Sequence, residues 1–557
     1  MSIFMMNVRT AFLFAVSALV VAAVCLGPAG LTQAQEPASP LAPPEQSQAD
    51  AADEPAEEET AESDSVSARI QKKIDAWFGK VTLNYLVPML FVGVPTGFDK
   101  NIPLILLVLV LGGIFFTFRF GFVNIRMFRH SIAVIRGKFD RPEDEGEITH
   151  FQALTSALSA TVGLGNIASV AVAVATGGPG AIFWMWMIAF FGMSSKFSSC
   201  SFGQLYRRVK PDGTVLGGPM VYLDDGIREH YPRLAPLGKI FGYSFAFFTV
   251  MGTMGAGNMF QGNQTFKMFA RQFDLPNSYA LPVGILLAVL VGMVIIGGIR
   301  RIGEVTSKLV PIMCGFYCVV CLIIIFTNVD KVPAMFASIF GGAFSLESAF
   351  GGFIGSLIIG ARRAAFSNEA GLGSAAIAHA AARTEEPVRE GIVAMVGPFI
   401  DTILVCTMTA LAILITQSHL DSETGKPYAA DVADTRGVEI TAAAFESLGT
   451  LLPYFLCIAV FIFAYSTMIS WSYYGERAVE YMLGMRAVVP YRFVYVLAVV
   501  VGPLITKLDN LLLFCDIMLL CMAFPNIIGM VMLSHVLKKR EQDYIGRLKS
   551  GQMKPVN

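Results

Sequence analysis

The sequence contains few charged residues for its length. Of its 557 residues only 15% are charged, whereas 54% are hydrophobic and the mean hydropathy is +0.60. A water-soluble chain of this size would leave far too much apolar surface in contact with water. The composition therefore excludes a soluble protein and predicts an all-α membrane protein that crosses the bilayer many times.

The sequence also lacks an excess of charge of either sign. Its 41 lysines and arginines are matched by 42 acidic residues, for a formal net charge of -1, so the basic surface that nucleic-acid binding requires is missing. No G-x-x-x-x-G-K-[ST] phosphate loop occurs, which argues against ATP as an energy source. No carboxylate pair or nucleophile motif indicates an enzyme, and we expect no cofactor.

The nine cysteines do not suggest a disulfide framework. Cys25 lies in the N-terminal leader, and the other eight lie within or beside apolar stretches. Cys314, Cys318 and Cys321 share one helical face, which leaves a metal site and simple packing as the two interpretations. Packing is favoured, because no histidine or carboxylate lies nearby in sequence to complete a ligand set.

The first 68 residues have the composition of an export signal and a tail. Residues 1–34 combine an apolar core from Ala11 to Leu26 with a small-residue cleavage site that ends at Ala34. An uncleaved signal anchor is the alternative. Residues 35–68 are rich in proline, alanine and acidic residues and contain almost no large apolar ones, so we expect a disordered acidic tail on the exported side.

From residue 69 to 540 the chain is predicted to form a transporter-sized bundle of apolar spans, each long enough to cross the bilayer. The eleven predicted spans are 101–119, 152–175, 180–206, 240–262, 278–298, 305–328, 348–366, 391–416, 452–474, 490–506 and 510–535. Most lysines and arginines fall in alternate loops, which places the N-terminus outside and the C-terminus, with a tail at 541–557, in the cytoplasm. With the export signal, this predicts a multi-pass protein of the bacterial inner (plasma) membrane.

The second span is interrupted in its middle by the stretch from Ser159 to Ala168. Gly163 and Gly165 each weaken a helix by about 1 kcal/mol, and Asn166 places an amide where an unpaired polar group is costly. The functional interpretation is a discontinuous helix that binds a small zwitterion and a cation. The alternative is that the glycines only allow two helices to pack closely.

A second glycine-interrupted region, residues 351–373, lies five spans later. Interrupted spans at corresponding places in two halves indicate an inverted-repeat secondary transporter. The two halves share no residue strings, so this prediction depends on spacing and topology.

Four long strings resemble signatures of the alanine or glycine:cation symporter family. They are TSALSATVGLGNIASVAVAVATGGPGAIFWMW (155–186), GGPM (217–220), FSNEAGLGSA (366–375) and FAYSTMISWSYYGE (463–476). The resemblance implies sodium- or proton-coupled amino-acid symport and a LeuT-type five-plus-five inverted repeat preceded by one extra helix at 101–119. The core repeats would then be about 152–328 and 348–535, with core helices 1 and 6 at the spans that begin near 152 and 348.

This resemblance leads to a functional prediction: symport of a small neutral amino acid, alanine or glycine, with Na⁺ into the cell by alternating access. Proton coupling is the alternative, and a channel or a polytopic membrane enzyme is less favoured. The expected partners are the amino acid, Na⁺ and the lipid bilayer, without nucleic acid or ATP.

The sequence departs from the family pattern at two places near the predicted site. Leu164 replaces the usual threonine of a GTGN pattern, and Ile359 replaces an aromatic residue of core helix 6. We expect both changes to affect which amino acid is preferred, alanine, glycine or another, more than they affect transport itself.

The predicted substrate site combines the broken core helix 1 with residues of three other helices. Backbone groups at the break would meet the substrate carboxylate, Gln261 would offer an amide, and Trp471 would close over the side chain. For Gln261 an interhelical hydrogen bond without a ligand is the alternative, and for Trp471 packing or a membrane-interface position. The full predicted set is Thr161, Gly163, Leu164, Gly165, Asn166, Gln261, Gly355, Ile359, Gly360 and Trp471.

The predicted Na⁺ site consists of neutral oxygens between core helices 1 and 8. Na⁺ is a hard cation that takes carbonyl and hydroxyl ligands, and the candidates are Thr161, Ser466, Thr467 and Ser470. The alternative is that these hydroxyls bond back to the carbonyl one turn before, as is common in membrane helices.

Several charged residues fall inside the predicted spans and are functional candidates. They are Lys196, Asp401 and Asp516, with Arg362, Arg363 and Glu369 toward the inner end of core helix 6. The sequence is compatible with an interhelical ion pair, such as Asp401 with an arginine, and equally with a proton relay. It does not show which of these residues interact.

Overall fold

The computed structural model describes residues 69, 71–76, 93–94, 102–345, 352–421, 424–428, 430–447, 449 and 451–555. The predicted signal peptide at 1–34 and the acidic tail at 35–68 lie outside the described residues. Both therefore stay predictions.

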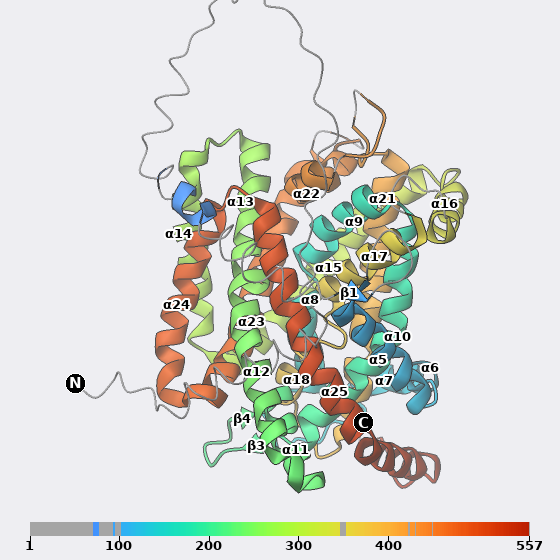
Figure 1. Cartoon of the computed structure of the whole chain (residues 1–557), viewed down its shortest axis with the longest axis vertical. Helices are drawn as coiled ribbons and strands as arrows, with labels where there is room; N and C mark the ends of the chain where they lie inside the picture. The colour runs from blue at the N-terminus through green and yellow to red at the C-terminus, as the bar shows by residue number, and fades with distance from the viewer. Residues whose placement is uncertain are drawn as a thin grey trace, which may run out of the picture.

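The described chain is built mainly of helices (Figure 1). The helices are α5 (Leu104–Arg119), α6 (Val123–Arg126), α7 (Phe128–Ile135), α8 (His150–Thr161), η2 (Gly165–Ser169), α9 (Val170–Gly177), α10 (Gly180–Leu205), α11 (Pro219–His230), η3 (Pro232–Leu234), α12 (Ala235–Met254), η4 (Gly255–Met259), α13 (Phe260–Phe273), η5 (Asn277–Tyr279), α14 (Ala280–Ile295), α15 (Gly298–Thr327), α16 (Val332–Phe344), α17 (Gly352–Asn368), α18 (Ala375–His379), α19 (Pro387–Ala394), α20 (Val396–Pro398), η6 (Phe399–Cys406), α21 (Thr407–Thr416), α22 (Ala430–Glu446), α23 (Leu452–Leu483), η7 (Met485–Ala487), α24 (Val488–Val501), η8 (Gly502–Leu504) and α25 (Leu508–Lys549). The strands β1 (Gly93–Val94) and β2 (Ile102–Pro103), and β3 (Arg208–Val209) and β4 (Val215–Leu216), form two antiparallel pairs.

The long helices form one bundle with different caps at its two ends. Figure 1 shows α22 and α16 at one end, and α11 with the β3–β4 hairpin at the other. Helix α10 packs against α5, α16, α17, α18 and α19. Its first residue, Gly180, lies so close to α16 that an added Cβ would fall 2.3 Å from the carbonyl carbon of Gly342.

Every predicted span coincides with a helix or a run of helices, but the count of eleven stays a prediction. Within the described ranges, seven helices are long and apolar enough to cross a membrane, or eight if the bent pair α8 and α9 is one span. Helices α5 and α17 have only 16 and 17 residues. The second half of α10 is rich in serine and contains Lys196, which lowers its hydropathy. The extra N-terminal helix and the LeuT-type repeat therefore stay predictions as well.

Local sequence explains where the helices around the site begin and end. Thr149 and Gln152 form a reciprocal capping box at the start of α8. Gly178, with φ of +69°, ends α9 and is followed by Pro179, which begins the turn into α10. Gly484, with φ of +85°, ends α23 in the same way.

Helix α25 extends well beyond the span predicted at 510–535. It continues to Lys549, through most of the segment predicted as a tail. Arg547 bonds both carboxylate oxygens of Glu386 at 2.6 and 3.0 Å, and the Tyr544 hydroxyl lies 2.8 Å from Nε2 of His130. The end of α25 therefore packs against α7 and the segment before α19.

Candidate functional site

The second predicted span is discontinuous in the structure. The axes of α8 and of the segment Gly165–Gly177 differ by 52°, and Val162 between them has an extended ψ of 92°. The Gly163 N–H donates to Asn166 Oδ1 at 2.9 Å, and the Asn166 N–H donates to the Gly163 carbonyl at 3.1 Å. The first N–H groups of the second half-helix have no acceptor within their own helix, so they face the break with positive polarity.

Helix α23 crosses directly beside the break. Thr467 Oγ1 donates to the Ser159 carbonyl at 3.0 Å, and Ser159 Oγ donates to the Ser466 carbonyl at 2.7 Å. An added Cβ at Gly163 would lie 2.6 Å from Thr467 Oγ1, so this position has no room for a side chain. Gly163 thus permits close packing of two helices and also lies at the break of the discontinuous helix. Both interpretations of the sequence therefore apply at this glycine.

Gln261 presents an unused acceptor to the break. Its Nε2 donates to the Ala256 carbonyl at 2.9 Å, one turn earlier in η4. Its Oε1 is buried without a hydrogen-bond partner among the described residues and lies 3.7 Å from the position of a Cβ on Gly163. A buried unpaired acceptor is costly, so this oxygen is suited to a donor brought by a ligand.

Trp471 lies on the other side of the same helix end. Its indole Nε1 donates to the Ala160 carbonyl at 3.0 Å, in the last turn of α8. The ring packs against Gly257, where an added Cβ would lie 2.4 Å from Trp471 Cγ. Only 2% of Trp471 is exposed, which does not fit a membrane-interface anchor.

Three of the four predicted Na⁺ ligands already have hydrogen-bond partners. Thr161 Oγ1 bonds back to the carbonyls of residues 157 and 158, and Ser466 Oγ to that of residue 463. Thr467 bonds across to α8, as described above. Ser470 Oγ is buried and has no partner in the described part of the chain. The oxygens are gathered between α8 and α23, with the hydroxyls of Thr161 and Ser466 bonded as in the alternative interpretation.

A buried carboxylate joins the break to two other helices, and sequence analysis did not place it there. Asn166 Nδ2 donates to Asp401 Oδ1 at 2.5 Å. Ser367 Oγ and Thr402 Oγ1 donate to Asp401 Oδ2 at 2.7 and 2.9 Å. Asp401 is fully buried in η6, so it places one negative charge beside the broken helix. The available signals were an acidic residue inside an apolar span and the serine of the FSNEAG string.

Two of the three predicted residues of core helix 6 pack against α9 and α10. Helix α17 is continuous through Gly355, Ile359 and Gly360. Gly360 packs against α10, where an added Cβ would lie 2.6 Å from the Ala181 carbonyl oxygen, and Ile359 packs against Gly177. Ile359 and Gly360 thus contribute to helix packing, and the part of Gly355, Ile359 and Gly360 in substrate binding stays a prediction.

The chain interruption in this region comes after α17 instead. Glu369, Gly371 and Gly373 have φ of +54°, +86° and +96°, and they connect α17 to the short helix α18. Phe366, in the last turns of α17, brings its ring within 3.3 Å of the Cβ position of Gly165. The second half of the site is therefore formed by the end of α17.

The other intramembrane charges are paired or bonded. Arg362 and Arg363 each donate to Asp516 Oδ2, at 2.6 and 2.5 Å. Lys196 Nζ donates to the Asn368 carbonyl at 3.1 Å. The structure thus assigns the arginines to Asp516 and the amide and hydroxyl donors to Asp401.

The cysteines give no sign of a metal centre. Cys314, Cys318 and Cys321 are free. Among the described residues, no group of three histidine, cysteine, aspartate or glutamate side chains is arranged to hold a metal ion.

Comparison with known proteins identifies the family. The model of the sodium:alanine symporter family matches residues 91–557. The chain belongs to the sodium:alanine symporter family. It is 42% identical over 434 residues to the sodium/alanine symporter AgcS of Methanococcus maripaludis, covering 78% of this chain and 92% of AgcS.

Two further relatives are described more broadly or with a different substrate. The chain is 34% identical to the amino-acid carrier protein AlsT of Bacillus subtilis, over 79% of this chain and 89% of AlsT. It is 33% identical to the probable sodium/glutamine symporter GlnT of the same organism, over 80% and 89%. Among solved structures it is similar to MhsT in complex with L-phenylalanine, with 12% identity and a TM-score of 0.47 over 71% of this chain and 99% of MhsT.

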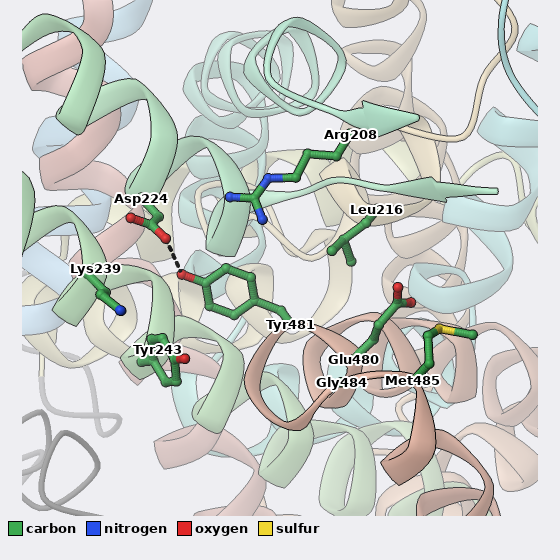
Figure 2. Close-up of a pocket in the computed structure, with 9 residues that line it drawn as sticks. All are labelled: Arg208, Leu216, Asp224, Lys239, Tyr243, Glu480, Tyr481, Gly484 and Met485. Carbon is green, nitrogen blue, oxygen red and sulfur yellow. Dashed lines mark hydrogen bonds between the residues drawn. The ribbon is translucent and has the colours of Figure 1, made fainter. Parts of the chain in front are cut away.

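This chain also has a cavity of about 340 Å³, which lies away from the broken helix. Figure 2 shows that it lies between the β3–β4 hairpin, α11, α12 and the end of α23, with the Tyr481 hydroxyl bonded to Asp224 at 3.0 Å. Glu480, another lining residue, is thirteen positions after Thr467 on α23, so the two lie about 20 Å apart. Charges of both signs line this cavity, and it is not part of the candidate substrate site.

Proposed function

We propose that this chain carries a small neutral amino acid, alanine or glycine, into the cell together with Na⁺. The observation that carries the proposal is the broken helix α8–α9, which lies beside the buried Gln261 Oε1, an acceptor without a hydrogen-bond partner among the described residues. The first N–H groups of the second half-helix have no acceptor within that helix. A zwitterion has the complementary pair of charges. Membership of the sodium:alanine symporter family supports Na⁺-coupled amino-acid symport.

The amino acid would bind across the break. Its carboxylate would accept hydrogen bonds from the N–H groups of Leu164 and Gly165 at the start of the second half-helix, where the helix polarity favours an anion. Its ammonium group would donate to Gln261 Oε1. Leu164 and Trp471 are both buried apolar residues, and they would pack against a short apolar side chain of the substrate.

The cation would bind on the other side of the same break. The oxygens of Thr161, Ser466, Thr467 and Ser470, with carbonyls of α8, supply neutral ligands of the kind that Na⁺ prefers. Asp401 adds a negative charge that favours any cation near Asn166. The same buried carboxylate also supports the alternative of H⁺ coupling, since a proton would neutralise it.

Transport would occur by alternating access. The residues of the break are buried, which supports a closed form between the two open states. Movement of the helices that meet at the break would open the site to one side at a time. We further propose that the protein lies in the bacterial inner membrane with its N-terminus outside and its C-terminus in the cytoplasm.

Amino-acid binding to the purified protein tests this function. Labelled alanine should bind in NaCl but much more weakly in KCl at the same pH, and Gln261→Leu should abolish binding without changing elution on size exclusion. Glycine should compete with alanine. Binding of alanine that is equal in sodium and potassium would refute sodium coupling, and a requirement for low pH in its place would favour the proton.

A channel or a membrane enzyme makes a different prediction in vesicles. A channel would let alanine equilibrate but never accumulate, and an enzyme would change it chemically. Recovery of unmodified alanine above its external concentration excludes both.

A further inference from the structure

The pair of arginines on α17 carries more positive charge than its partner neutralises. Both guanidinium groups bond the same oxygen, Oδ2 of Asp516. The exposed fractions of Arg363 and Asp516 are only 5% and 2%. Among the described residues, two cations and one anion leave a net charge of +1 at this position, and an uncompensated charge is costly where it is removed from water.

The arginines also retain unused donors. Arg362 Nε and Arg363 Nη1 are buried and have no hydrogen-bond partner among the described residues. A charged donor that is removed from water and left unpaired costs more than a neutral one. The excess positive charge and the unpaired N–H groups both favour the binding of a small anion.

The position of the pair connects it to the broken helix. The Arg363 guanidinium lies 5.9 Å from the centre of the Phe366 ring, and that ring contacts Gly165 at the break. Phe260 packs edge-to-face on the same ring at 5.3 Å. The Phe366 ring thus separates the arginine pair from the substrate site.

Arg362 is only partly buried. Helix α17 is surrounded by α9, α10, α16 and α25, yet 24% of the Arg362 side chain is exposed. Asp516 is eight residues after the start of α25, or about 12 Å along the helix. In the proposed orientation α17 runs from the outside inward, and Arg362 precedes Phe366, whose ring contacts the break. Arg362 therefore lies on the outer side of the break, although it is nearer the inner end of α17 itself.

We propose that Arg362 and Arg363 form a binding site for a small monovalent anion on the outer approach to the broken helix. The chemistry fits two sources, the carboxylate of the incoming amino acid and chloride. The first source depends on the function proposed above, whereas the second does not. In either case Arg362 makes the reachable contact and Arg363 is held in place by Asp516.

The test compares Arg362→Gln with Arg362→Lys, which keeps the charge. Both variants leave the buried Arg363–Asp516 pair intact, so the fold should be retained. Arg126→Gln is the matched control, because Arg126 also pairs with a single carboxylate, that of Glu541 at 2.8 Å, but lies far from the break and is 47% exposed.

One arm of the experiment uses chloride alone as the probe. Purified protein in gluconate buffer without amino acid is titrated with chloride, and the melting temperature is recorded. A saturable rise in the native protein, in Arg362→Lys and in Arg126→Gln, but not in Arg362→Gln, would identify chloride as an occupant.

The other arm measures alanine uptake by vesicles in chloride-free medium. Loss of a charged hydrogen bond to the carboxylate should raise the KM of Arg362→Gln about tenfold, with most of the loss restored in Arg362→Lys. Added chloride should then compete with alanine in the native protein.

The proposal is overturned if Arg362→Gln is folded, responds to chloride like the native protein and has an unchanged KM for alanine. If the native protein does not bind or carry alanine at all, the proposed function fails, and the chloride titration alone decides whether the anion site exists. A response to chloride that is equal in all variants would reflect general ionic strength and would also overturn the site.

Discussion

Replacing Thr467 tests the proposed cation site at one atom. Thr467 is buried in the middle of α23 with its hydroxyl against α8, 3.0 Å from the Ser159 carbonyl. The same oxygen is 2.6 Å from the Cβ position of Gly163 at the break. Thr467→Ala removes this oxygen and leaves the backbone of both helices in place.

The size of the effect follows from the contact that is lost. One neutral hydrogen bond or ligand oxygen contributes about 1 kcal/mol net, and 1.4 kcal/mol corresponds to a tenfold change in affinity. The sodium concentration for half-maximal uptake should therefore rise about fivefold. Thr467→Ser keeps the oxygen and should stay close to the native value.

The assay is the sodium dependence of labelled alanine uptake in proteoliposomes at saturating alanine. Thr249→Ala is the control, because Thr249 is also buried and, in the described part of the chain, its hydroxyl bonds only within its own helix, to the Phe245 carbonyl at 2.8 Å. An unchanged sodium dependence in Thr467→Ala, or an equal change in Thr249→Ala, would refute the assignment of this oxygen to the cation.

Three further predictions concern the same framework. Asp401→Asn removes the negative charge beside the break, so sodium-dependent uptake should fall at least about tenfold while the variant elutes normally on size exclusion; native uptake would show that the carboxylate has no part in coupling. Gly257→Ala places a Cβ 2.4 Å from Trp471 Cγ, and this overpacking should lower the stability of the fold by about 1–3 kcal/mol. The variant should show a lower melting temperature and weaker alanine binding, and an unchanged melting temperature would contradict the packing. Burial and a nearby arginine lower the pKa of His130 from 6.5 to about 4, so the folded state favours the neutral ring. The contact of His130 with Tyr544 should therefore be fully stable above pH 6.5 and weaken as the pH falls toward 4. Hydrogen exchange of residues 540–549, corrected for intrinsic rates, would detect this pH dependence, and His130→Gln should abolish it.

The first break could be predicted from sequence because its cause is local. Gly163, Gly165 and Asn166 are neighbours in the chain, and each is unfavourable within an apolar span unless it is used. Asp401 lies 235 residues from Asn166. The sequence showed that this acidic residue needed a partner, but only the packing of η6 against the break selects Asn166 and Ser367 over an arginine.

The second interrupted region was predicted over the whole stretch 351–373, but the sequence did not show which of its glycines interrupt the helix. Gly355 and Gly360 lie inside a continuous helix, and Gly360 lets α17 approach α10 closely, whereas Gly371 and Gly373 adopt positive φ and end the helical path. The sequence alone does not distinguish a glycine that allows close helix packing from a glycine that allows a turn. Only the surrounding helices distinguish them.

The helix boundaries show a similar limit. Helices α16 and α22 were not predicted, since α16 has only 13 residues and α22 is largely polar. Helix α25 continues to Lys549 although its apolar part ends earlier. Its last turns are held by Glu386, which is 161 residues away in the chain, so hydropathy alone could not extend the helix.

Accumulation of alanine against its gradient is the most direct test of the central claim. Proteoliposomes that contain the purified protein are placed in labelled alanine under an inward sodium gradient with the pH equal on both sides. The account predicts that internal alanine rises above the external concentration and falls back when a sodium ionophore collapses the gradient. Internal alanine that never exceeds the external concentration, under sodium or proton gradients and across small neutral amino acids, would contradict it.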